Sequence, residues 1–172
     1  MNELIIVDGY NFIFNFVPEQ GMDNDRLAFY RDRLINDLAG YSEARGRGVV
    51  VVFDARHSNN SGRTTHAFDK IKVIYSKRGE TADTVIEEMV NRDRTHSKIF
   101  VVTSDYLQQK VIFKKNIYRI SSREFGLQLN QFKSELRREV KEINRKSESS
   151  FYNLGTRLSK KALDDFTKIR NN

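Results

Sequence analysis

The chain contains no cysteine among its 172 residues. This absence excludes a disulfide framework and any metal site built on thiolates, and it is typical of proteins from a reducing compartment. Long apolar runs are also missing. No window approaches the ~20 apolar residues that a membrane-spanning helix needs, and the N-terminal residues have no charged region followed by an apolar stretch. We therefore expect a cytoplasmic protein with no membrane partner.

Histidine is scarce, and the three residues His57, His66 and His96 lie in polar segments without the spacing of metal ligands. Positive charge, by contrast, is plentiful: 30 Lys and Arg stand against 23 Asp and Glu, a net charge of +7. The excess is concentrated in residues 121–172, which carry 12 basic and 7 acidic side chains. A basic surface does not by itself identify a ligand, but it favours a polyanion such as nucleic acid.

Short apolar runs and longer amphipathic segments alternate along the chain. Strands are predicted at 3–7, 48–53, 70–75, 98–102 and 116–120, and helices at 25–45, 81–92, from Ser104, 122–146 and 159–170. Asp23 or Asn24 can cap the first helix, and Thr81 the second. Continuous rather than alternating hydrophobicity in the strands indicates a parallel sheet covered on both faces, and so an α/β sandwich. Residues 55–67 are predicted as a loop, and residues 147–152 with Gly155 as a break between two C-terminal helices.

Acidic residues follow the predicted strands. Five carboxylates come from four segments that are distant in sequence: Asp8, Asp54, Glu80, Asp83 and Asp105. In open α/β sheets the carboxyl ends of the strands meet at one edge, where ligands bind. Carboxylates gathered there repel one another unless a cation lies between them, and an all-oxygen set favours Mg²⁺ or Mn²⁺ over Zn²⁺. Taken singly, each acid is explained equally well as a turn residue or a helix cap; the joint pattern favours a metal site.

Four short segments carry a resemblance to a known family. DGYN (8–11), VVFDA (51–55), GETADTVIEEM (79–89) and VVTSD (101–105), in this order and spacing, resemble the NYN domain family, relatives of the PIN-type metal-dependent ribonucleases. The chain is most similar to the YacP-like branch, small bacterial proteins that include a ribosome-associated endoribonuclease cleaving mRNA during translation. The family usually has a glycine-containing turn before the last strand, where this chain has FKKN (113–116).

The resemblance implies a fold and a domain organisation. The implied fold is a three-layer PIN-like α/β sandwich with a five-stranded, mainly parallel sheet of strand order 3-2-1-4-5. Because the match covers residues 3 to about 125, we expect a nuclease core over 1–125. Residues 126–172 would form a basic helical extension packed on or beside this core.

The resemblance also implies roles for individual residues. Asp8, Asp83 and Asp105 would bind Mg²⁺ or Mn²⁺, with Glu80 beside Asp83 and Asp54 either bound to the metal or supporting a ligand. Asn11 would help to hold the metal or the scissile phosphate. Thr103 or Ser104 would touch a phosphate. Tyr10, Phe12 and Phe14 are candidates for stacking on bases, although aromatic residues beside a strand more often belong to the core.

Basic residues near the strand ends are candidate RNA contacts: Arg56, Lys77, Arg78, Arg119 and Arg123. The leading hypothesis is an endoribonuclease acting on mRNA, with the ribosome as a partner and no DNA substrate expected. The alternative is a non-catalytic RNA- or ribosome-binding protein that retains the nuclease fold. A phosphoacceptor signalling domain is disfavoured, because residues 23–45 read as one helix and leave no room for the extra helix and strand of such domains.

Overall fold

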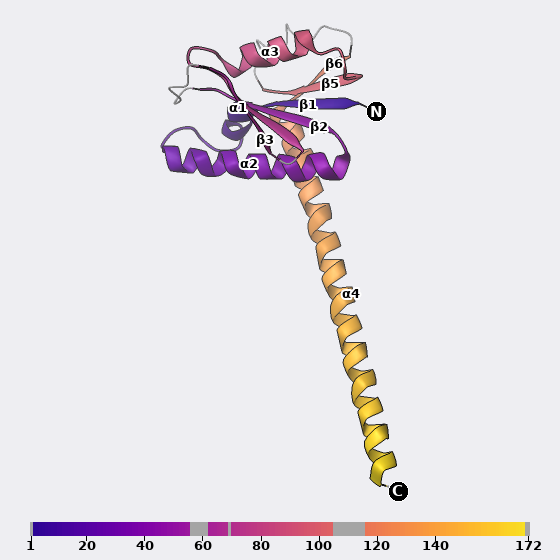
Figure 1. The fold of residues 1–172 in the computed structure, drawn as a ribbon. Coiled ribbons are helices and arrows are strands. Elements are labelled where there is room, and N and C mark those ends of the chain that lie inside the picture. Colours follow the sequence, from indigo (N-terminus) through magenta and orange to yellow (C-terminus); the bar gives the residue numbers. More distant parts are fainter. Residues whose placement is uncertain (1, 56–61, 69, 105–115, 171–172) are drawn as a thin grey trace. The chain divides into compact units, whose positions relative to one another are not determined.

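The computed structural model describes residues 2–55, 62–68, 70–104 and 116–170, with side chains described as far as residue 146. Helices and strands alternate along most of the chain (Figure 1). They are β1 (Glu3–Asp8), α1 (Gly9–Phe14), α2 (Asn24–Arg45), β2 (Gly48–Phe53), β3 (Thr64–Phe68), β4 (Ile71–Tyr75), α3 (Ala82–Arg92), β5 (Lys98–Val102), β6 (Ile117–Ile120) and α4 (Ser122–Arg170).

The strands form one mixed sheet of six, in the order β3-β4-β2-β1-β5-β6. Five of them are parallel and reproduce the predicted order 3-2-1-4-5, which confirms the fold class. Their carboxyl ends therefore lie at one edge: Asp8 pairs in register with Val52 of β2, and Val7 with Val102 of β5. This edge is where the acidic residues were expected.

Helices cover both faces of the sheet, with α3 on one side and α2 on the other (Figure 1). Against α3, a buried cluster joins Val85, Ile86 and Val90 to apolar residues of β1, β2 and β5. On the opposite face, α2 buries Leu34, Leu38 and Tyr41 and contacts β2 and β4. Cover on both faces explains why the last five residues of β2 (GVVVVF) are all buried.

The helix starts follow the capping rules. The Asp23 side chain accepts the N–H of Arg26 and begins α2, and Gly46 ends that helix in the left-handed region at φ 62°. Thr81 accepts the N–H of Thr84 and begins α3, as predicted. Asn116 has a φ of 77° just before β6, so asparagine takes the conformation for which a glycine would be expected in that turn.

Two predicted features are wrong. The segment predicted as a loop contains an additional strand, β3, which pairs antiparallel with β4 at the edge of the sheet. The predicted break at 147–152 is absent, because α4 runs without interruption for 49 residues, so that one helix replaces two. The helix predicted to start at Ser104 lies outside the described residues.

The chain divides into two compact units, residues 1–129 and residues 130–172. The first contains the whole sheet, and the second consists of the remainder of α4. Along the described ranges, no helix combines the length and the apolar character needed to cross a membrane.

Candidate active site

Asp8 connects the sheet to the candidate site. It is the last residue of β1, it is 7% exposed, and its Oδ1 accepts the N–H of Asn11 at 3.1 Å, which caps the six-residue helix α1. The next residue, Gly9, lies directly against the ring of Phe53, where an added Cβ would overlap the ring. Asp8 therefore ends the strand and Gly9 begins the helix. Because Gly9 has no side chain, the start of α1 can pack against Phe53 of β2.

Asn11 holds together three segments that are far apart in sequence. Its Oδ1 accepts the backbone N–H of Ser104 at 2.9 Å and the hydroxyl of Ser122 at 3.0 Å. Asn15, one turn further on, donates from Nδ2 to the hydroxyl of Ser104 at 3.0 Å. These bonds fix α1 to the segment after β5 and to the start of α4. The described geometry therefore assigns Asn11 a positioning role; the predicted contact with metal or phosphate stays a prediction.

A cavity of about 380 Å³ opens at the carboxyl edge of the sheet. Its polar lining includes the carboxylates Asp8, Asp54, Asp83 and Glu19, together with Asn11, Asn15 and Thr81; Tyr10 and Phe14 complete it. Three of the five predicted metal ligands thus come together from β1, the end of β2 and the first turn of α3. All nine lining residues are neutral or acidic, so among the described residues this cavity has a strongly negative wall.

The donor set suits a hard divalent cation. Carboxylate and amide oxygens are the ligands that Mg²⁺ and Mn²⁺ prefer, and neither histidine nor cysteine contributes. Within the parts of the chain that the structure describes, no three acidic or histidine side chains lie close enough to chelate one ion by themselves. Mg²⁺ does not require such a cage, because it keeps several waters and is commonly held by one or two carboxylates plus substrate phosphates. The residues therefore fit this class of ion.

The carboxylate of Glu80 is engaged elsewhere. It receives Nε of Arg63 at 2.8 Å and a second guanidinium nitrogen at 2.6 Å, and the same arginine also bonds Glu88 of α3. The hydrogen bonds from Arg63 lower the pKa of Glu80. Glu80 does not line the cavity. The structure thus gives Glu80 a link between the segment before β3 and α3, and its metal-binding role stays a prediction.

The predicted basic contacts are dispersed. Lys77 and Arg78 are exposed in the turn before α3, and Arg123 is exposed in the first turn of α4. Arg119 of β6 is exposed and donates to the backbone oxygen of Thr103 at 3.2 Å. Arg56 and the predicted ligand Asp105 lie outside the described residues.

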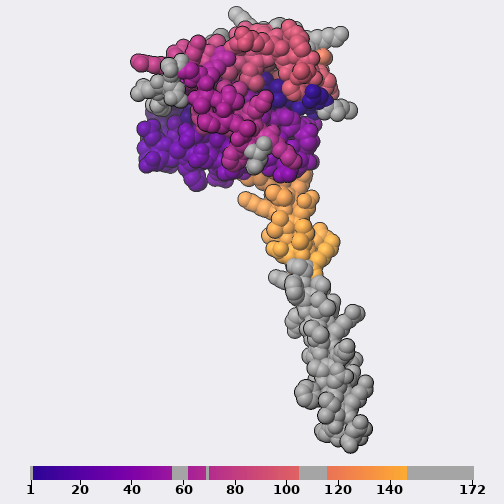
Figure 2. Space-filling model, in the orientation of Figure 1, coloured from indigo at the N-terminus to yellow at the C-terminus, as the bar shows by residue number. Residues whose placement is uncertain are grey.

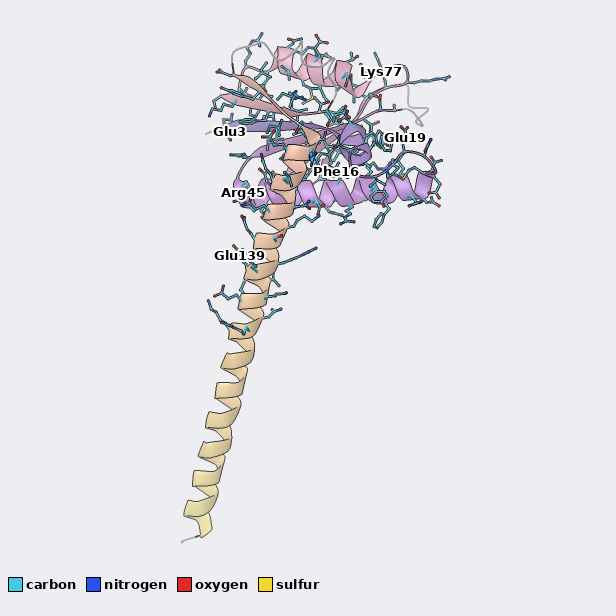
Figure 3. All side chains as sticks on the ribbon, turned by 180° about the vertical axis from the view of Figure 1, so that it is seen from behind. Glu3, Phe16, Glu19, Arg45, Lys77 and Glu139 are labelled. Atoms are coloured by element: carbon cyan, nitrogen blue, oxygen red, sulfur yellow. The ribbon has the colours of Figure 1, made fainter. Side chains whose placement is uncertain are left out.

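Sequence reasoning missed one acidic residue of the cavity. Glu19 comes from the segment between α1 and α2, and it follows no strand, so the rule that located the other acids does not reach it (Figure 3). Of the aromatic candidates, Tyr10 and Phe14 line the cavity, whereas Phe12 is 8% exposed and belongs to the core.

The fold and the acidic cavity agree with a known family. The family described as the YacP-like NYN domain matches residues 5–171. The chain belongs to this family. The uncharacterized protein YacP of Bacillus subtilis (strain 168) is 32% identical to this YacP-like chain over 171 residues, 98% of this chain and 96% of that protein.

Solved structures give the same result. The crystal structure of Rae1 (YacP) from Bacillus subtilis is similar with a TM-score of 0.70 at 29% identity, over 98% of this YacP-like chain and 95% of the other. The crystal structure of a mutant of Rae1 (YacP) has a TM-score of 0.66 at 31% identity, over 82% of each chain. Family membership and the PIN-like fold support a nuclease-type function.

Proposed function

We propose that this protein is a metal-dependent endoribonuclease that cleaves mRNA, in association with the translating ribosome. The observation that carries the proposal is the cavity at the carboxyl edge of the sheet, where Asp8, Asp54 and Asp83 converge from three separate elements. Such acids are costly to place together, and a phosphodiester hydrolase has a use for them.

Mg²⁺ or Mn²⁺ would be held by Asp8 and Asp83, with Asp54 beside them and Asp105 as a further candidate ligand. When bound, the ion supplies a Lewis acid for the phosphate and lowers the pKa of a bound water. The protein's own contribution is to fix these carboxylates. Asp8 is fixed by the end of β1 and the start of α1, Asp83 by the first turn of α3, and Asn11 secures α1 against its neighbours.

The RNA substrate is supported by the net charge of +7 and by the exposed cations Lys77, Arg78, Arg119 and Arg123 on the segments around the strand ends. An acidic cavity within a basic protein divides the work: the cavity carries out the chemistry, while lysine and arginine hold the phosphate backbone. The ribosome is proposed as a partner from membership of the YacP-like family.

The decisive test is cleavage by the Asp83→Asn variant. An mRNA is incubated with the purified protein and Mg²⁺ or Mn²⁺, with and without active translation, and the cut ends are mapped. We expect 5′-phosphate and 3′-hydroxyl ends that disappear with EDTA, and a loss of at least about a hundredfold in Asp83→Asn, since even residues behind metal ligands contribute ~10–100-fold. RNA binding should be largely kept.

Glu43→Gln is the matched control, because Glu43 is an exposed acid whose partner is the exposed Lys70 at 3.1 Å. It should cleave like the unaltered chain. Equal cleavage by Asp83→Asn and Glu43→Gln would refute the proposal. Cutting only during translation would support the ribosome-dependent form of the activity.

The second candidate is a non-catalytic RNA- or ribosome-binding protein. It is favoured by the net charge of +7, which suits the binding of a polyanion and requires no metal. A protein that binds RNA with a steep salt dependence, yet never cuts in the presence of Mn²⁺, would establish this alternative.

A further inference from the structure

A second hollow, which shares no lining residue with the acidic cavity, lies beside the sheet. It has a volume of about 520 Å³ and lies between α2, which contributes Asp32 and Asn36, and the edge strands, which contribute His66, Phe68 and Tyr75. We call it the lateral groove. Figure 2 shows that atoms of the β3–β4 segment and of α2 border one another on this face. Its size is within the ~300–1,000 Å³ of typical small-ligand sites.

The groove exists because β3 extends the sheet with a strand that is exposed along most of its length. Four of its five residues are exposed, including His66, and Phe68 retains 40% of its surface. His66 and Phe68 are two residues apart, so they project from the same face of the strand. An imidazole and a phenyl ring are thus presented side by side in a protein that otherwise buries most of its apolar residues.

Ring contacts connect the groove to the acidic cavity. Tyr10, which lines the cavity, lies 5.0 Å from the ring of Phe53, and Phe53 stacks on Tyr75 with centroids 5.6 Å apart. Tyr75 lines the groove and contacts His66 edge-on at 6.0 Å. The row therefore runs from one hollow to the other, with Phe53 buried at its centre.

Arg31 of α2 lies beside Tyr75, which lines the groove. Its guanidinium carbon is 5.9 Å from the centroid of the Tyr75 ring. Its Nε is buried and has no hydrogen-bond acceptor among the described residues; the nearest carboxylate oxygen, on Asp32, is 3.5 Å away. A guanidinium has five N–H groups in a planar fork suited to phosphate.

We propose that the lateral groove is a nucleobase-binding subsite for the single-stranded RNA that flanks the cleavage site. A phosphate of this flank lies at Arg31, and its bases stack on Tyr75, His66 and Phe68. The inference rests on the proposed nuclease function, which it deepens by naming where the substrate leaves the cavity.

The geometry favours RNA over other occupants. The register pairs Thr64 with Tyr75 and Phe68 with Ile71, so the groove follows about 13 Å of strand, the length of roughly four stacking steps between nucleotides. The Arg31 cation lies over the Tyr75 ring, aromatic rings line the wall, and Asp32 and Asn36 offer acceptors to the amino groups of bases. Ring contacts link the groove to the cavity proposed to cut RNA, which favours a strand of the same substrate over a peptide or a lipid.

The test measures binding separately from cleavage. A short, unstructured, fluorescein-labelled RNA is titrated by anisotropy into the Asp83→Asn chain, with and without the added pair His66→Ala and Phe68→Ala. Stacking contributes ~1–3 kcal/mol per base, so we expect the pair to weaken binding by about fivefold to a hundredfold. Phe29→Ala is the matched control, since Phe29 is an exposed aromatic of α2, 61% exposed, that does not line the groove. It should bind normally.

A second measurement does not depend on the variants. RNA carrying 4-thiouridine is irradiated with the unaltered chain in EDTA, and cross-links are expected on Tyr75, His66 or Phe68. Any one of three results would overturn the proposal. The double variant His66→Ala and Phe68→Ala could bind RNA as tightly as the Phe29→Ala control, the chain could fail to bind RNA, or the cross-links could be confined to other segments. Cleavage by the unaltered chain together with any of these results refutes only the groove. Groove-dependent binding without cleavage refutes only the nuclease.

Discussion

Replacing Asn11 with alanine tests how the candidate active site is held together. Its Oδ1 accepts both the N–H of Ser104 and the hydroxyl of Ser122, and Ser122 is fully buried. Asn11→Ala leaves that buried hydroxyl without its acceptor, which costs ~1–3 kcal/mol, and removes the bond to the exposed Ser104, worth ~0.5–1 kcal/mol. We expect a loss of about 2–3 kcal/mol, or roughly 4–10 °C in Tm for a chain of this size.

Urea denaturation followed by circular dichroism measures this loss, and a double-mutant cycle assigns it. The double variant Asn11→Ala and Ser122→Ala no longer has the unsatisfied Ser122 hydroxyl. Its loss of stability should therefore be about 1 kcal/mol smaller than the sum of the losses in the two single variants. Asn15→Ala is the control, because Asn15 is exposed and, among the described residues, its side chain donates to the exposed hydroxyl of Ser104. Additive losses in the cycle, or an Asn11→Ala chain as stable as the Asn15→Ala chain, would refute the positioning role.

Two further substitutions probe the surroundings of the site. Gly9→Ala should destabilise by about 1–3 kcal/mol because its Cβ overlaps the Phe53 ring, whereas Gly62→Ala, whose Cβ meets no described atom within 4 Å, should change the unfolding midpoint little. Arg63 lowers the pKa of Glu80 below its ordinary 4.5, so the pair stabilises the fold above that pH and ceases to do so as Glu80 is protonated. Arg63→Gln should therefore lower Tm at neutral pH, with the difference shrinking below about pH 4; a difference independent of pH would contradict this reasoning.

The parallel core was predictable because its signals are local. Val49 to Val52 form an apolar run that suits only a strand buried on both faces, and Asp23 and Thr81 are ordinary caps. The strand β3 was not predictable, since TTHAF has neither an apolar run nor a buried face and depends on its pairing with β4. The predicted break in α4 failed because its serines carry no backbone constraint that would stop a helix.

The candidate site was predictable where the fold itself places the acid. Asp8 ends β1, Asp54 follows β2, and Asp83 follows the turn after β4, and the strand order brings them together. Glu80 is only three residues from Asp83 but precedes the cap of α3, and Arg63, beside the strand that was missed, binds it. Glu19 reaches the cavity through the path of a loop, which no local pattern encodes.

The position of Asp8 affects how any experiment on this chain is interpreted. One carboxylate ends a strand, begins a helix of only six residues and forms part of the cavity wall. A helix so short has almost no stability of its own, so removing its cap would loosen the whole DGYN segment as well as delete a charge. An inactive Asp8 variant would therefore be ambiguous between lost chemistry and lost architecture, whereas Asp83, on an eleven-residue helix capped by Thr81, allows the two to be separated.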